Sequence, residues 1–338
     1  MLQYQNVDSV SLRSRLLSAV LRRTLKPLLS RQDYDPLASR SKLQNGLPTR
    51  RAARGVAIST ISEQLTGNAL LRGEWQIPRE ASAEHCILYL HGGGYMLGSP
   101  SQYRAVTSHL AKWAGASLFS LDYRLAPEQP FPAAVEDALL AFDYLCKRFA
   151  AERIVLMGDS AGGGLALALI HALKQRKLPL PGGAVVFSPY ADLLASGDSV
   201  RENSERCAMF SAESVPRAAS FYLQGADGRD PLASPLYGDF SGFPPLCIFV
   251  SDSEIIRDDG IRIAHKASAA GVPVRLNIWR NQPHAWPAFY PLLPEAERCL
   301  REAAEWFGTL FGFRKVAASE AQNRDIAAPA NPCSKTPD

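Results

Sequence analysis

A serine flanked by glycines lies near the middle of the chain, in the sequence Gly-Asp-Ser-Ala-Gly at residues 158–162. The motif directly follows the apolar run 154–157 and directly precedes the helical run 163–173. A strand, a tight turn and a helix in this order hold a serine hydroxyl out at the edge of a sheet. We therefore predict that Ser160 is the nucleophile of an acyl-transfer reaction.

A glycine-rich loop about 70 residues earlier has the sequence His-Gly-Gly-Gly-Tyr at residues 91–95. Acyl transfer passes through a tetrahedral oxyanion, which is stabilised by N–H groups that already point at the developing charge. We predict that the backbone N–H groups of Gly93, Gly94 and Ala161 form this oxyanion hole. His91 is expected to anchor the loop by hydrogen bonding.

A serine hydroxyl needs a base to remove its proton, and histidine is the usual choice. Among six histidines, His284 lies in a predicted loop after the last strand and follows the serine in the order expected for a strand–turn–helix nucleophile. His85 and His265 are expected at the surface. His109 and His171 fall on predicted helices and are expected to be structural.

A carboxylate should orient the imidazole, and it should follow a strand that lies between the serine and the histidine in sequence. Four candidates come directly after the apolar run 246–250, namely Asp252, Glu254, Asp258 and Asp259. The residue types and their spacing leave these four open.

Together these motifs resemble the bacterial hormone-sensitive-lipase-like esterases of the α/β-hydrolase fold. The resemblance covers residues 75–312 and rests on His-Gly-Gly-Gly at 91–94, Gly-Asp-Ser-Ala-Gly-Gly at 158–163, Pro-His at 283–284, and Asp-Tyr-Arg-Leu-Ala-Pro-Glu at 122–128 with Phe-Pro-Ala-Ala at 131–134. It implies a serine carboxylesterase that needs no cofactor and acts on short-to-medium acyl esters. A lactone hydrolase or a deacetylase of a small metabolite is the alternative within the family.

The resemblance also separates the four acid candidates. In the family this stretch reads acid, any residue, aliphatic, any residue, Asp, and Glu254 gives that pattern with Ile256 in the aliphatic position and Asp258 at the end. A start at Asp252 would place Glu254 itself where an aliphatic side chain is buried, which is costly for an unpaired charge. Glu254 is therefore the predicted acid, although the family usually has Asp.

These residues need a scaffold, and the chain from residue 84 onward alternates short apolar runs with longer helical periods. Such alternation predicts a mostly parallel sheet flanked by helices, here an α/β-hydrolase fold with a helical cap. The strands are expected at 86–90, 116–121, 153–157, 184–187, 246–250 and 274–278, and the helices at 133–150, 161–177, 260–270 and 294–310.

We expect five segments: an N-terminal cap segment over 1–75, a first part of the catalytic core over 76–190, a second cap segment over 191–240, a second part of the core over 241–314, and a disordered tail over 315–338. Leucines recur at three- and four-residue spacing over residues 12–29, which predicts an amphipathic helix that docks on the sheet. Met96, Leu97 and Phe210 are expected to line an apolar substrate pocket.

The composition narrows the remaining function classes. The 338 residues contain no apolar run near the 18 to 20 residues that cross a bilayer, and the six cysteines form no metal-binding or disulfide pattern, so a cytoplasmic location is expected. Residues 1–54 hold 11 Lys or Arg against three Asp, a charge of +8. The expected partner is a small-molecule ester, with no metal, no nucleic acid and no stable membrane insertion. A homodimer, a small-molecule receptor of the same fold and a lipase recruited to membranes by the basic N-terminus are the alternatives.

Overall fold

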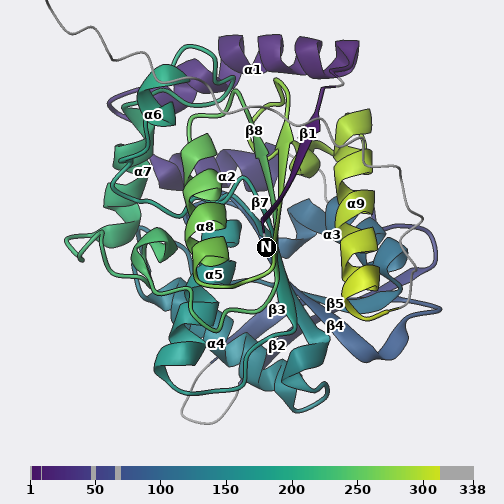
Figure 1. Cartoon of the computed structure of the whole chain (residues 1–338). Coiled ribbons are helices and arrows are strands. Elements are labelled where there is room, and N and C mark those ends of the chain that lie inside the picture. Colours follow the sequence, from purple (N-terminus) through teal and green to yellow (C-terminus); the bar gives the residue numbers. More distant parts are fainter. Residues whose placement is uncertain (1, 9, 47–50, 65–69, 313–338) are drawn as a thin grey trace, which may run out of the picture.

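One mixed sheet runs through the centre of the molecule, with strand order β1-β9-β8-β7-β6-β4-β5-β3-β2 (Figure 1). The computed structural model of the chain describes residues 2–8, 10–46, 51–64 and 70–312. The strands are β1 Leu2–Val7, β2 Val56–Gln64, β3 Leu70–Pro78, β4 Ser82–Leu90, β5 Ala116–Leu121, β6 Ile154–Asp159, β7 Gly183–Phe187, β8 Leu246–Ser251 and β9 Val274–Trp279. Neighbouring strands from β1 to β5 in this order are parallel, while β3 pairs antiparallel with both β5 and β2.

Helices cover both faces of the sheet, as the apolar strands require. On one face lie α3 Pro100–Ala114 and α9 Pro294–Leu310; on the other lie α4 Ala133–Cys146, α5 Ala161–Gln175 and α8 Arg257–Ala269 (Figure 1). Each face has its own cluster of buried side chains. The predicted α/β-hydrolase architecture is confirmed.

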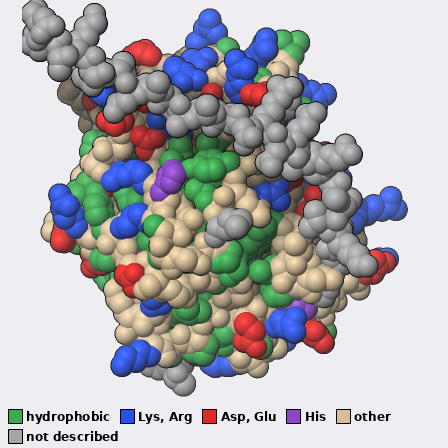
Figure 2. All heavy atoms as spheres, viewed as in Figure 1, with side chains coloured by type: hydrophobic (Ala, Val, Ile, Leu, Met, Phe, Trp, Pro, Cys, Tyr) green, Lys and Arg blue, Asp and Glu red, His purple; other side chains and the backbone are tan. Residues whose placement is uncertain are grey.

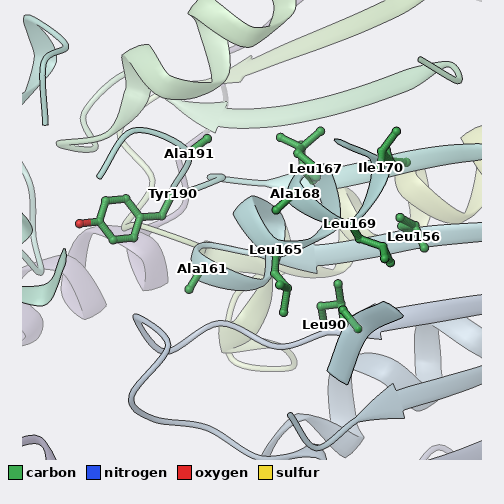
Figure 3. Packing of buried hydrophobic residues seen from close by; sticks show 14 of the residues in the cluster. Leu90, Leu156, Ala161, Leu165, Leu167, Ala168, Leu169, Ile170, Tyr190 and Ala191 are labelled. Carbon is green, nitrogen blue, oxygen red and sulfur yellow. The ribbon is translucent and has the colours of Figure 1, made fainter. Parts of the chain in front are cut away.

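The helix α5 carries the serine motif at its N-terminus and is the most deeply buried helix of the core. All of its residues from Ala161 to Leu173 are buried. Figure 3 shows Leu165 and Leu169 directed toward Leu90 and Leu156 of the sheet. A helix that is apolar on every side must lie inside the protein, so α5 holds its N-terminus in a fixed place.

The remaining helices lie over the carboxyl ends of the strands. They are α1 Leu12–Ser30, α2 Pro36–Gly46, α6 Ser199–Glu202 and α7 Ser214–Leu223. Hydrogen bonds connect α1 to the segment that contains α6 and α7. Lys26 Nζ donates to the Cys207 carbonyl at 3.1 Å, and Arg217 donates to the carbonyls of Leu29 and Ser30. No helix in the described ranges is long and apolar enough to span a bilayer.

Residues 1–75, expected to be an N-terminal cap segment, also contribute strands to the sheet, which the sequence analysis did not predict. Strands β1 and β2 and most of β3 fall within this segment and extend the sheet at its two ends, where β1 pairs with β9 and β3 with β5. Strands β1 and β2 are half-exposed and carry mixed polar and apolar residues, so they lack the apolar runs that mark the central strands. The expected tail over 315–338 lies outside the described residues.

A buried histidine on α5 gives the fold a specific dependence on pH. The His171 ring packs against Phe240 and Phe243, and burial lowers the pKa of the imidazole to about 4. As the pH falls below about 6.5, the unfolded chain takes up a proton that the folded protein binds only near pH 4. Stability is therefore lost across this window as the pH falls.

We expect His171→Gln to remove this contribution to the pH dependence of stability, because glutamine does not titrate. The free energy of unfolding of the wild type should fall, relative to that of the variant, by up to about 1.4 kcal/mol per pH unit between pH 6.5 and 4. Urea unfolding at pH 7.5, 6 and 5 measures this. Parallel curves for the two proteins would show that the buried imidazole does not contribute to acid sensitivity.

Candidate active site

Ser160 lies in a sharp turn between β6 and α5, with a φ of 51° and a ψ of −121°. A positive φ is strained for a residue with a side chain. The flanking glycines allow the turn, since a Cβ at Gly162 would lie 2.0 Å from the Leu90 carbonyl oxygen and one at Gly158 would lie 2.5 Å from the Gly162 oxygen. Both contacts are with backbone, so only glycine fits at these two positions.

Three side chains from separate loops form a continuous chain of hydrogen bonds at this turn. His284 Nε2 lies 2.8 Å from Ser160 Oγ, and His284 Nδ1 lies 2.7 Å from Glu254 Oε2. The second carboxylate oxygen of Glu254 accepts a 2.6 Å hydrogen bond from the Ser251 N–H. Glu254 is fully buried, so these bonds fix both the carboxylate and the imidazole that it faces.

The other three acid candidates make different contacts. Asp252 accepts a hydrogen bond from the Asn281 N–H, Asp258 pairs with a neighbouring arginine, and Asp259 accepts from two backbone N–H groups after β7. Of the four, Glu254 is the one whose carboxylate reaches His284. The aspartates hold the loops around the site in place.

The glycine loop follows β4 and lies beside Ser160. Gly93 and Gly94 have φ values of 121° and 65°, and a Cβ at Gly93 would lie 2.2 Å from the Leu97 carbonyl oxygen. Within the described residues, the N–H groups of Gly93, Gly94 and Ala161 have no hydrogen-bond acceptor. Free N–H groups next to a nucleophile are what an oxyanion requires.

A buried carboxylate that sequence reasoning missed anchors this loop. Asp159 accepts hydrogen bonds from the hydroxyls of Tyr89 and Tyr103, both at 2.9 Å, and from the Gly92 N–H at 3.0 Å. Burial raises the pKa of its carboxyl group, while the three donors oppose that shift. Asp159 directly precedes Ser160 in the motif, and this position is the feature of the sequence that could have indicated its role. It connects the serine turn to the glycine loop.

The other histidines are kept away from the serine. His91 is buried, stacks on Tyr123, and its Nδ1 lies 2.8 Å from the Gly92 oxygen, in keeping with a structural role in the loop. The expected surface position of His85 is wrong: it is 1% exposed, beneath the C-terminal end of α9, and lies within hydrogen-bond distance of Ser82. Its place on β4, inside the sheet, explains the burial.

A mostly apolar cavity of about 280 Å³ opens over Ser160 and His284. Met96, Leu97 and Phe210 line it, as the sequence analysis expected, and the Phe210 ring stands edge-on to His284. Further lining comes from Leu25 and Leu29 of α1 with Tyr34 of the loop after it, and from Met209 before α7 with Val215 and Ala218 of α7. An apolar cavity next to a nucleophile suits an acyl group.

Comparison with known proteins places this geometry in a family. Residues 87–288 match a family model described as the alpha/beta hydrolase fold. The chain belongs to the α/β-hydrolase family. It is 42% identical over 240 residues to an acetyl-hydrolase from Streptomyces hygroscopicus, an alignment that covers 71% of this chain and 80% of that protein.

Solved structures place it more narrowly. A crystal structure of an esterase from the bacterial hormone-sensitive lipase family matches with a TM-score of 0.81 and 34% identity, covering 90% of this chain and 100% of the other. The esterase EstE5, in crystals soaked with p-nitrophenyl butyrate, matches with a TM-score of 0.82, the same identity and the same coverage. The predicted resemblance is confirmed, and the chain is a carboxylic ester hydrolase of this family.

We expect the size of the cavity to limit the acyl chain. Ala218 of α7 lines the cavity, so Ala218→Phe should fill part of it. The kcat/KM for p-nitrophenyl hexanoate should fall by about tenfold or more, since each excluded methylene costs about 1–3 kcal/mol, whereas the value for the acetate should change little. Rates on p-nitrophenyl esters of increasing chain length measure this.

Ser220→Phe on the exposed side of the same helix is the matched control and should leave both rates unchanged. An equal loss of activity on every ester after Ala218→Phe would mean that the acyl chain does not occupy this part of the cavity.

Proposed function

We propose that Ser160, His284 and Glu254 form the catalytic triad of a serine carboxylesterase that hydrolyses short-to-medium acyl esters through an acyl-enzyme. The observation that carries the proposal is the hydrogen-bond chain from Glu254 to His284 to Ser160, with distances of 2.7 and 2.8 Å, beneath an apolar cavity. Its order and geometry match the roles of acid, base and nucleophile.

In the first half of the reaction, Ser160 Oγ attacks the ester carbonyl carbon and its proton passes to His284 Nε2. The Glu254 carboxylate stabilises the imidazolium through Nδ1, and the N–H groups of Gly93, Gly94 and Ala161 stabilise the oxyanion. The tetrahedral intermediate collapses, the alcohol leaves with the proton from His284, and an acyl-enzyme remains. Water then repeats the sequence, releasing the carboxylic acid and restoring Ser160.

The substrate class follows from the cavity and the relatives. A mostly apolar volume of about 280 Å³ suits a short or medium acyl chain, and the acetyl-hydrolase relative suggests that acetyl esters are among the substrates. A lactone or an acetylated metabolite would react by the same steps, so the alternative within the family stays a proposal. A receptor of the same fold is disfavoured, because a protein that only binds does not need an aligned base and acid.

We propose that α1 and α2, together with residues 191–240, form the cap over this cavity, since both segments contribute lining residues.

A cytoplasmic location is proposed from the cysteines: the five in the described residues are free thiols, and four of them are buried. Cell fractionation tests the location. A homodimer also stays a proposal, for which gel filtration is the test.

We expect Ser160→Ala to lower kcat/KM by about 10⁴-fold or more while the protein remains folded, because the turn loses only a hydroxyl. Hydrolysis of p-nitrophenyl acetate and the thermal midpoint measure the two effects. Ser99→Ala, which changes a serine outside the cavity, is the control and should keep normal activity. Covalent labelling of a residue other than Ser160 by an organophosphate would refute the assignment.

We expect Glu254→Gln to lower kcat by about 10³- to 10⁴-fold with the fold retained. The amide side chain of this variant would have one oxygen for the two donors that Glu254 now accepts, Ser251 N–H and His284 Nδ1–H, so the imidazole would lose its tautomer or its orientation. Asp252→Asn is the matched control and should lose only a few-fold, because Asp252 faces Asn281 instead. The reverse ranking of the two variants would make Asp252 the acid.

A further inference from the structure

The outer face of α1 is apolar although it faces solvent. Leu12, Leu16 and Val20 are 71%, 58% and 54% exposed, and Leu28 near the end of the helix is 43% exposed. Eleven large hydrophobic side chains are exposed among the described residues, and these four lie on one helix. Leu28 is about 120° around the helix from Leu16, so the outer face itself holds Leu12, Leu16 and Val20. Exposed hydrophobic side chains that cluster in this way mark an interaction surface.

The contacts between α1 and the core explain the apolar residues on the opposite side of the helix only. Ser14, Ser18 and Leu21 are buried, and Leu25 and Leu29 line the cavity above Ser160. Residues four apart lie along one side of a helix, so Leu12, Leu16 and Val20 form a single stripe on the other side. The leucines predicted from the sequence therefore lie on two faces of α1, and the core covers one of these faces.

The helix is also strongly basic. It carries Arg13, Arg15, Arg22, Arg23 and Lys26 and has no acidic residue. At about 100° per residue, Arg23 falls between Leu12 and Leu16 around the helix, and Arg13 falls beside Val20. Figure 2 shows basic side chains along the upper edge of the molecule, where α1 lies. The three apolar side chains thus share the outer face of α1 with Arg23, and Arg13 lies at the edge of that face.

Further positive charge lies beside this face. A polar cavity of about 410 Å³ between α1 and the loops after β1 and β9 is lined by Arg15, Arg22, Arg206 and Arg280, with Asp8 as the one acidic lining residue among those described. Arg206 is partly neutralised by an ion pair with Asp252. Arg15 and Arg280 make no side-chain hydrogen bond or ion pair with other described residues, so no ion pair there neutralises these two charges.

We propose that the outer face of α1 docks on an anionic phospholipid surface, with Leu12, Leu16 and Val20 inserted among the acyl chains and the arginines at the headgroups. An amphipathic helix with basic residues beside its apolar stripe lies in such an interface without crossing the bilayer. A second copy of this chain fits the face poorly, because two helices that carry only positive charges would repel each other. The inner face of α1 would keep its place over the cavity, which would then lie close to the lipid.

Sedimentation of the full-length protein with sucrose-loaded vesicles tests the proposal. The protein should bind vesicles that contain phosphatidylglycerol at least tenfold more strongly than vesicles of phosphatidylcholine alone, and 0.5 M salt should weaken the binding. The triple variant Leu12→Ser, Leu16→Ser, Val20→Ser should bind the anionic vesicles at least tenfold more weakly. Its hydrolysis of p-nitrophenyl acetate should stay at the wild-type rate, because none of the three residues lines the cavity.

Two matched variants control for the number of changes. The triple variant Leu178→Ser, Leu194→Ser, Leu292→Ser changes three other exposed side chains and should leave binding unchanged. Arg13→Gln with Arg23→Gln should weaken binding, whereas Lys147→Gln with Arg176→Gln should not.

Three results would overturn the proposal. The first is a wild-type protein that does not sediment with anionic vesicles, and the second is a triple variant that binds as tightly as the wild type. The third is a wild-type dimer in gel filtration that becomes monomeric in the triple variant, since the face would then be a contact between copies.

Discussion

The site depends on one close approach of backbone, where the turn between β6 and α5 packs against the end of β4. A Cβ at Gly162 would lie 2.0 Å from the Leu90 carbonyl, and Ser160 takes a φ of 51° to make the turn. Because α5 is buried on every side, it cannot move away to relieve this contact. The packing of the core therefore sets where the serine hydroxyl, the free Ala161 N–H and the glycine loop meet.

Much of this arrangement could be predicted from the sequence, because the central strands are short apolar runs and α9 has a clear helical period, matched by the structure at 294–310. The strands at the edges of the sheet could not be predicted in this way. Strand β2 is half-exposed, and its residues alternate too weakly to mark it as a strand. Its place depends on pairing with β3 and, through β3, with β5, and these contacts between distant segments leave little trace in local sequence.

In the candidate site, too, some residues could be predicted from local sequence while others depend on contacts between distant segments. Ser160 and His284 were accessible to sequence reasoning because a motif and the chain order mark them, but the acid needed the register of a family pattern to separate Glu254 from its neighbours. Asp159 was missed although it lies inside the best motif. Its partners, Tyr89 and Tyr103, are 70 and 56 residues away in sequence. A residue that acts by joining two loops can be recognised only when both loops are in place.

The leucine pattern of α1 shows why periodicity alone gives an incomplete answer. Periodicity indicates that a helix is amphipathic, but it does not give the number of faces that are covered. In the structure, Leu25 and Leu29 face the cavity while Leu12 and Leu16 face solvent, so one helix contributes to both the cavity and the surface. Ser160, His284 and Glu254 sit on loops held by the buried sheet, whereas α1 and α7 line the cavity and are held by a few side-chain contacts, such as Arg217 with the end of α1. We therefore expect substitutions in these two helices to change which esters enter the cavity without disturbing the side chains beneath it.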